Sequence, residues 1–160
     1  MQLYVAIIMK SRKDAIREII NRHEDNAVYI TNTGYISRAV YNEYPNNKNI
    51  FYMQGSMGMA PCIGLGIAMN SDKEIVVLNG DAALLMHLGI THTIRDENLK
   101  NLYIYVLDNG CHESVGKYKC SYLEDFYSGI TEIIKISNDG KTDRVELSCI
   151  KNTNQIKELF

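Results

Sequence analysis

The sequence has few cysteines and no clustered ones, which excludes several small metal-bound or disulfide-bound classes of protein. Four cysteines are spread along the chain without any C-x-x-C spacing: Cys62, Cys111, Cys120 and Cys149. This spacing argues against a small disulfide scaffold, a zinc knuckle and an iron–sulfur site. It fits a protein of the reducing cytoplasm.

The sequence also lacks an excess of charge of one sign and a long apolar run. Its 17 Lys and Arg residues against 19 Asp and Glu residues give a formal net charge of −2, so no basic surface is available to dominate nucleic-acid binding. The apolar run 3–9 is too short to span a bilayer and precedes no small-residue cleavage site. We therefore expect a cytoplasmic protein without nucleic acid or membrane as partner, and leave open whether Met1 or Met9 is the start.

The composition and the order of apolar segments predict a single α/β domain over residues 1–160. Hydrophobic residues make up 46% of the sequence and charged residues 22%, which is typical of one compact domain. Apolar strands that alternate with helical segments favour a mainly parallel sheet flanked by helices. We expect strands at 27–31, 50–53, 74–79 and 102–107, and helices at 11–22, 35–44, 60–69 and from about 81 to 94.

Beyond Gly116 the sequence pattern is weaker. The spacing of apolar residues predicts a helix face from Leu123 to Ile130, a strand at 133–136, a turn at 139–140 and a strand at 144–150. These elements complete an α/β domain only if the strands join its sheet.

Glycine-rich or polar segments follow four of the expected strands. Ligands bind at the carboxyl ends of the strands in an open parallel sheet, and the segments placed there are 33–34, 55–58, 80–83 and 108–112. Asp81 and Asn109 offer two hard oxygen ligands of the kind that Mg²⁺ takes together with substrate phosphates. Taken alone, Gly80-Asp81 is also explained as a turn and a helix N-cap without any metal.

The segments taken in order are more specific than any one of them. The run from Gly80-Asp81 to Asp108-Asn109 resembles the thiamine diphosphate signature, a G-D-G segment that ends in two asparagines. Together with Thr31–Arg38, Tyr52–Gly58, Leu84–Gly89 and Asn109–Gly116, it resembles the diphosphate-binding domain of the phosphonopyruvate and sulfopyruvate decarboxylases. The resemblance covers about residues 11–116 and implies the three-layer thiamine diphosphate-binding fold.

The resemblance implies a role for each residue of these motifs. Mg²⁺ would be held by Asp81, by the side-chain oxygen of Asn109 and by the backbone carbonyl of Cys111. The cofactor-binding positions would be Thr33, Gly55, Ser56, Met57, Gly80, Ala82, Ala83 and Ser114. Among these, Met57 would lie under the cofactor as a wedge that forces its two rings into a V shape.

Two residues beside the metal loop are the candidate catalytic residues. His112 and Glu113 would assist proton transfer or meet the anionic tail of the substrate, and the alternative is a solvated loop pair. Ser37 and Arg38 would face either the substrate or a partner chain, and for Arg38 a plain surface charge is an equal alternative.

The resemblance implies a carboxy-lyase that uses thiamine diphosphate and Mg²⁺ to decarboxylate 3-sulfopyruvate or 3-phosphonopyruvate, releasing CO₂ and an aldehyde. The glutamate that protonates the aminopyrimidine belongs to a pyrimidine-binding domain, and nothing in the sequence resembles that domain. We therefore expect a β subunit in a hetero-oligomer whose α subunit supplies this glutamate, with the interface at 55–69. A sulfopyruvate substrate would place the chain in coenzyme M biosynthesis.

The sequence departs from the family pattern at three places and leaves other functions open. Ala82 replaces the second glycine of G-D-G, residues 116–119 replace a glycine-rich stretch, and the region after Ser121 matches no family element. One alternative is a non-catalytic remnant of this domain that serves as a partner or regulatory subunit. Another is the thiamine diphosphate subunit of a different 2-oxoacid enzyme, such as an oxidoreductase. Such oxidoreductases normally work with iron–sulfur centres, and the sequence lacks the clustered cysteines that would favour this alternative. The choice between sulfonate and phosphonate also stays open.

Overall fold

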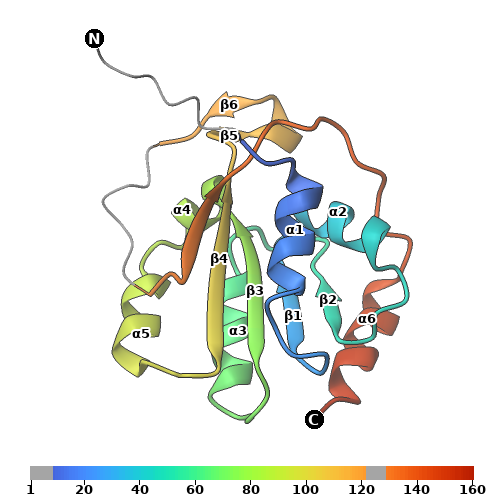
Figure 1. Ribbon diagram of the computed structural model, residues 1–160, viewed down its shortest axis with the longest axis vertical. Coiled ribbons are helices and arrows are strands. Elements are labelled where there is room, and N and C mark those ends of the chain that lie inside the picture. The colour runs from blue at the N-terminus through green and yellow to red at the C-terminus, as the bar shows by residue number, and fades with distance from the viewer. Residues whose placement is uncertain (1–8, 122–128) are drawn as a thin grey trace.

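A computed structural model describes residues 9–121 and 129–160 of the chain (Figure 1). Five strands form one sheet in the order β2-β1-β3-β4-β7, and all neighbouring strands are parallel. Their bounds are β1 Val28–Thr31, β2 Ile50–Tyr52, β3 Ile75–Gly80, β4 Leu102–Asp108 and β7 Glu132–Lys135. The predicted parallel α/β sheet is confirmed.

Helices cover both faces of the sheet, which confirms the three-layer architecture. Their bounds are α1 Arg12–Ile20, α2 Tyr35–Glu43, α3 Ala60–Ala68, α4 Asp81–Met86, α5 Ile90–Glu97 and α6 Cys149–Lys157. Residues of α1 and α2 share one core cluster with the sheet, whereas residues of α3, α5 and α6 share the other. A short hairpin, β5 Cys111–His112 and β6 Tyr118–Lys119, lies above the carboxyl ends of the strands (Figure 1). Within the described ranges, no helix has the length and apolar character needed to cross a membrane.

Burial on both faces explains why the central strand β3 is apolar at every position from Ile75 to Leu78, without alternation. Every residue of β3 is buried. Val76 and Leu78 belong to the core under α1 and α2, and Ile75 and Val77 belong to the core under α3. Because successive side chains of a strand point to opposite faces, a sheet covered on both faces needs apolar residues at every position.

The prediction of one helix from about 81 to 94 is wrong, because two helices, α4 and α5, occupy this segment. The backbone leaves the helical region at His87, where φ is −136° and ψ is 43°, and α5 starts again after Gly89. Helix α5 then continues to Glu97, and Asn98 ends it in the left-handed conformation with φ +46°.

The strand predicted at 144–150 is also wrong. Val145 and Leu147 do pack against the core while Arg144 and Glu146 are exposed, so the alternation is real. In the described chain, however, this segment pairs with no strand, and α6 begins at Cys149 with Ser148 as its N-cap. The strand predicted at 133–136 is confirmed as β7, and most of the helix predicted from Leu123 to Ile130 lies outside the described residues.

Two glycines of α3 provide a matched test of how closely this helix packs on β3. A Cβ atom on Gly64 would lie 2.4 Å from Cγ2 of Val77, whereas a Cβ atom on Gly66 would have no neighbour within 4 Å. Both Gly→Ala replacements gain the same helix propensity, so we expect Gly66→Ala to raise the free energy of unfolding by about 0.5–1 kcal/mol. Gly64→Ala should lower it by about 1–3 kcal/mol because the added methyl group overpacks the core. Urea denaturation of both variants measures the difference, and equal stabilisation by both would contradict the close packing.

Candidate functional site

The carboxyl ends of the strands form a pocket that brings together nearly all the predicted site residues. A cavity of about 60 Å³ lies there, beneath the β5–β6 hairpin. Its walls include Thr33, Met57, Gly80, Asp81, Ala82, Ala83, Asn109, Cys111, His112, Glu113 and Ser114. Of the predicted residues, Gly55 and Ser56 do not line it and are exposed beside it. The strand-end reasoning therefore located the pocket.

Asp81 presents a buried carboxylate oxygen to this pocket. The residue is 4% exposed at the start of α4, and its Oδ2 atom has no hydrogen-bond partner among the described residues. Burial raises the pKa of Asp81 to about 6; a hydrogen bond from the Ala82 backbone N–H opposes the shift and the nearby Asp108 carboxylate adds to it. A buried, unpartnered carboxylate oxygen is costly in the free protein. It is the chemistry expected of a cation ligand.

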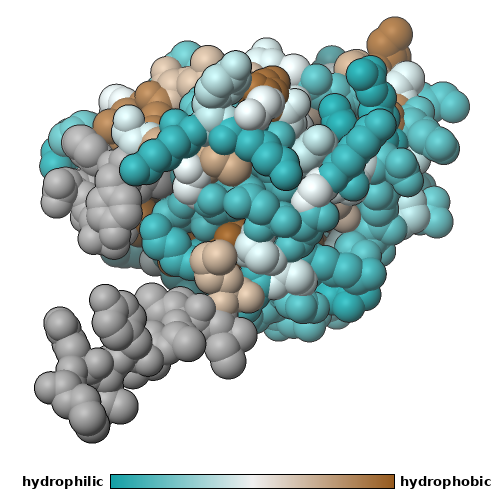
Figure 2. All heavy atoms as spheres, turned by 90° about the horizontal axis from the view of Figure 1, so that it is seen from above, coloured by the Kyte–Doolittle hydropathy of each residue, from teal (hydrophilic) through white to brown (hydrophobic). Residues whose placement is uncertain are grey.

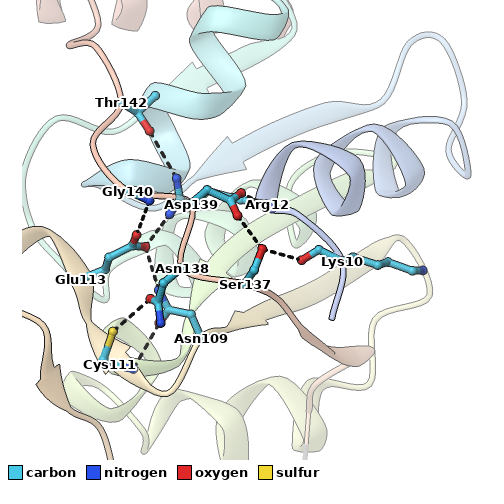
Figure 3. A network of polar contacts seen from close by, with 10 residues as sticks. All are labelled: Lys10, Arg12, Asn109, Cys111, Glu113, Ser137, Asn138, Asp139, Gly140 and Thr142. Atoms are coloured by element: carbon cyan, nitrogen blue, oxygen red, sulfur yellow. Dashed lines mark hydrogen bonds and ion pairs between the residues drawn. The ribbon is translucent and has the colours of Figure 1, made fainter. Parts of the chain in front are cut away.

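Asn109 follows β4 and is held in one orientation. Its Oδ1 atom accepts a hydrogen bond from the Cys111 backbone N–H at 3.2 Å, and its Nδ2 atom donates to Oε2 of Glu113 at 2.8 Å (Figure 3). Gly110 makes the turn between these residues with φ +73°. A carboxylate only accepts hydrogen bonds, so the Glu113 contact fixes which end of the amide carries the oxygen.

Glu113 is buried and bound on both of its oxygens. Arg12 forms an ion pair with Oε2 of Glu113, and both side chains are 4% exposed. The backbone N–H of Gly140 donates to Oε1 at 2.8 Å. Figure 3 shows Arg12, Asn109 and Gly140 converging on this carboxylate from three parts of the chain. The other candidate catalytic residue, His112, is half-buried at the pocket wall.

Sequence reasoning missed Arg12, which lies 101 residues from its partner Glu113. One signal was present: Arg12 is the first residue of α1, where the positive end of the helix dipole disfavours a cation. A cation at that place indicates a nearby anion, but the sequence does not say which one.

The loop after β2 packs directly against α4 and so places Met57 at the pocket. A Cβ atom on Gly58 would lie 2.6 Å from the carbonyl oxygen of Ala83, and Gly58 adopts φ +88°. The Gly58 backbone N–H donates to Oδ1 of Asn32 at 3.0 Å. Asn32 is a second buried site residue that the sequence analysis did not single out.

The oxygen atoms of this pocket fit Mg²⁺ better than a transition metal. The described residues contain no cluster of three His, Cys, Asp or Glu side chains. They offer the free Oδ2 of Asp81, together with Oδ1 of Asn109 and the carbonyl group of Cys111 at the same pocket. Mg²⁺ binds such hard oxygen sets when phosphate oxygens complete its coordination.

Comparison with known proteins gives a family for this fold and pocket. A family model described as the thiamine pyrophosphate enzyme, C-terminal TPP binding domain, matches residues 31–147. The sulfopyruvate decarboxylase subunit beta of Methanothermobacter thermautotrophicus is 41% identical over 117 residues, which are 73% of this chain and 62% of that relative.

Two further relatives extend this likeness. The phosphonopyruvate decarboxylase of Streptomyces viridochromogenes is 36% identical over 106 residues, which are 66% of this chain and 26% of that relative. The sulfopyruvate decarboxylase subunit beta of Methanococcus maripaludis is 26% identical over 154 residues, which are 92% of this chain and 83% of that relative. The chain thus spans less than two thirds of the first two relatives. By the family match and the fold, it belongs to the thiamine pyrophosphate enzymes as a C-terminal TPP binding domain.

Proposed function

We propose that the chain is the β subunit of a thiamine diphosphate-dependent decarboxylase that acts on 3-sulfopyruvate or 3-phosphonopyruvate. The observation that carries the proposal is the unpartnered Oδ2 atom of buried Asp81, which lines one pocket with Asn109 in a thiamine diphosphate-binding fold. A non-catalytic remnant would have no reason to keep a buried charge without a partner. The names of the similar proteins support the reaction and the two substrates.

Each part of the pocket has a proposed share in binding the cofactor. Asp81, Asn109 and the carbonyl group of Cys111 hold Mg²⁺. The backbone N–H groups of Ala82 and Ala83, the hydroxyl group of Thr33 and the amide or hydroxyl group of Ser114 would bind the diphosphate. Gly55, Ser56 and Met57 would hold the aminopyrimidine part of the cofactor, with the Met57 side chain as its support. All of these residues lie at or beside the same pocket.

The cofactor supplies the electron sink for decarboxylation when it is bound. The chain's own residues bind the cofactor, orient the substrate and exclude water from the pocket. His112, half-buried at the pocket wall, is the residue that we assign to proton transfer with the substrate. Glu113 also lines this pocket, where its carboxylate is held by Arg12, Asn109 and Gly140.

A second subunit is proposed to cover the pocket. Gly55 and Ser56 are exposed, and so are the apolar side chains of Met86, Val115 and Tyr118, of which Val115 lines the pocket and Tyr118 belongs to the hairpin above it. Figure 2 looks down on this end of the molecule and shows separate apolar patches in a mostly hydrophilic surface. We assign this face to the α subunit, which also supplies the glutamate for the aminopyrimidine.

Release of CO₂ by the complex tests the proposal. The chain is purified with the subunit that accompanies it and assayed with Mg²⁺, thiamine diphosphate and each of the two oxoacids. We expect release from one oxoacid in clear preference, and we expect Mg²⁺ with thiamine diphosphate to raise the melting temperature, because a ligand stabilises the state that binds it. Release from neither oxoacid would exclude the proposed decarboxylase, and absence of any cofactor-induced shift would favour the non-catalytic remnant.

A further inference from the structure

A second and larger cavity adjoins the cofactor pocket. Its volume is about 420 Å³, and it shares Thr33, Met57, Ser114 and Val115 with the first cavity. A small molecule in the second cavity would therefore touch the same wall as the proposed cofactor. The remaining walls of the second cavity carry no predicted cofactor-binding or metal-binding residue.

The second cavity is lined by two arginines and no acidic side chain. Arg38 comes from α2, and Arg144 comes from the segment between β7 and α6. Among the residues that the structure describes, no Asp or Glu lines the cavity and neither guanidinium forms an ion pair. Two cations in one concave wall repel each other, so an anion placed between them would gain from both.

Arg38 is held in place, whereas Arg144 is exposed. Nη1 of Arg38 donates to the Thr142 carbonyl at 3.4 Å, and its guanidinium lies 5.3 Å from the centre of the Tyr35 ring. These contacts use one of the five N–H donors of Arg38 and leave the others for a ligand. A pre-positioned guanidinium loses less conformational entropy when it binds.

Ser37 adds an independent observation. Ser37 is among the residues that line the same cavity, it is 1% exposed, and its Oγ atom has no hydrogen-bond partner among the described residues. Buried hydroxyl groups are normally hydrogen-bonded, so an unpartnered one at a cavity wall indicates a ligand or water that completes it.

We propose that Arg38, Arg144 and Ser37 form the subsite for the anionic head group of the substrate, a sulfonate or phosphonate. This inference rests on the proposed function. In both oxoacids one methylene group separates the head group from the ketone carbon, so the head-group subsite has to adjoin the cofactor pocket. The shared wall at Thr33, Met57 and Ser114 meets this requirement. Planar guanidinium groups match the oxygen spacing of such anions.

Binding of unreactive substrate analogues to the complex tests the subsite. Calorimetry with Mg²⁺ and thiamine diphosphate present measures the affinity for 3-sulfopropanoate and 3-phosphonopropanoate, which lack the ketone, and for butanoate, which lacks the charged head group. We expect Arg144→Met and Arg38→Met each to weaken binding of the preferred anion at least tenfold, which corresponds to about 1.4 kcal/mol. Neither replacement should change the affinity for butanoate. Arg95→Met on α5, far along the chain and outside this cavity, is the matched control and should change nothing.

The outcomes separate this proposal from the proposed function. Arg144 is exposed and makes no hydrogen bond or ion pair with the described residues, so its replacement should leave the fold intact even if the Arg38 variant is destabilised. If the complex binds thiamine diphosphate but the Arg144 variant binds the anions as tightly as the wild type, the subsite is excluded. Weaker thiamine diphosphate binding in that variant would place the cofactor in this cavity and also overturn the proposal. Failure of the wild-type complex to bind thiamine diphosphate would instead contradict the proposed function.

Discussion

Asp81→Asn is expected to abolish both the stabilisation by Mg²⁺ with thiamine diphosphate and the release of CO₂ by the complex. Asparagine keeps the shape of the side chain but removes the negative charge, and the buried Oδ2 of Asp81 at this pocket has no hydrogen-bond partner in the described part of the chain. A cofactor at a hundred times its Kd stabilises the protein by about 2.7 kcal/mol, and the variant should lose all of this.

The same replacement should stabilise the cofactor-free protein. The Asp81 carboxylate is buried beside Asp108, and the amide removes both the desolvation of a charge and the repulsion between the two groups. We expect a gain of about 1 kcal/mol in the free energy of unfolding. Thermal melts with and without Mg²⁺ and thiamine diphosphate measure both effects, with Asp25→Asn at an exposed position as the control. A variant that keeps the full cofactor-induced shift would contradict the role of Asp81.

The location of the candidate site was largely predictable because its motifs are local and follow strand ends. Residues such as Gly80, Asp81 and Asn109 directly follow or end apolar strands, and a parallel sheet brings the carboxyl ends of its strands together. The prediction needed only the order of strands and glycine-rich turns. It did not need any contact between distant parts of the chain.

Several of the parts that sequence reasoning missed depend on distant contacts. Arg12 meets Glu113, and Asn152 of α6 pairs its side-chain amide with both the backbone N–H and the carbonyl group of Tyr52 at the edge strand β2. Alternation at 144–150 shows that Val145 and Leu147 face the core, but not that a neighbouring strand is present to pair with. Propensity and periodicity report burial, and hydrogen-bond partners come from tertiary structure.

Removing Arg12 should cause the largest loss of stability among these variants. Arg12→Met leaves the Glu113 carboxylate buried without its cation, since both side chains of the pair are 4% exposed. Breaking a buried ion pair by removal of one partner costs about 3–5 kcal/mol. Urea denaturation of the variant measures the loss. A loss below about 1 kcal/mol, as for an exposed ion pair, would contradict the burial of this pair.

The variant Glu113→Gln distinguishes two roles for this carboxylate, which are orientation of the Asn109 amide and proton transfer. Glutamine has its own N–H donors, so it no longer forces Nδ2 of Asn109 to face it, and the Asn109 oxygen loses its fixed direction. Loss of a hydrogen bond that orients a metal ligand typically weakens metal binding by about 10–100-fold. Electron paramagnetic resonance of Mn²⁺ in the cofactor-loaded complex measures this affinity. If Glu113 instead moves protons, kcat falls while the Mn²⁺ affinity stays unchanged.

The double variant Arg12→Met/Glu113→Gln distinguishes orientation of the ligand from stability of the fold. It contains no unpaired buried charge at this place, so we expect it to be more stable than either single variant. Its Mn²⁺ affinity should nevertheless remain low, because the amide of Asn109 still faces a neutral group. Thr142→Val removes a different contact of Arg12 and leaves Glu113 and Asn109 bonded, so it should bind Mn²⁺ normally. Recovery of metal affinity together with stability in the double variant would show that Glu113 acts only through the fold.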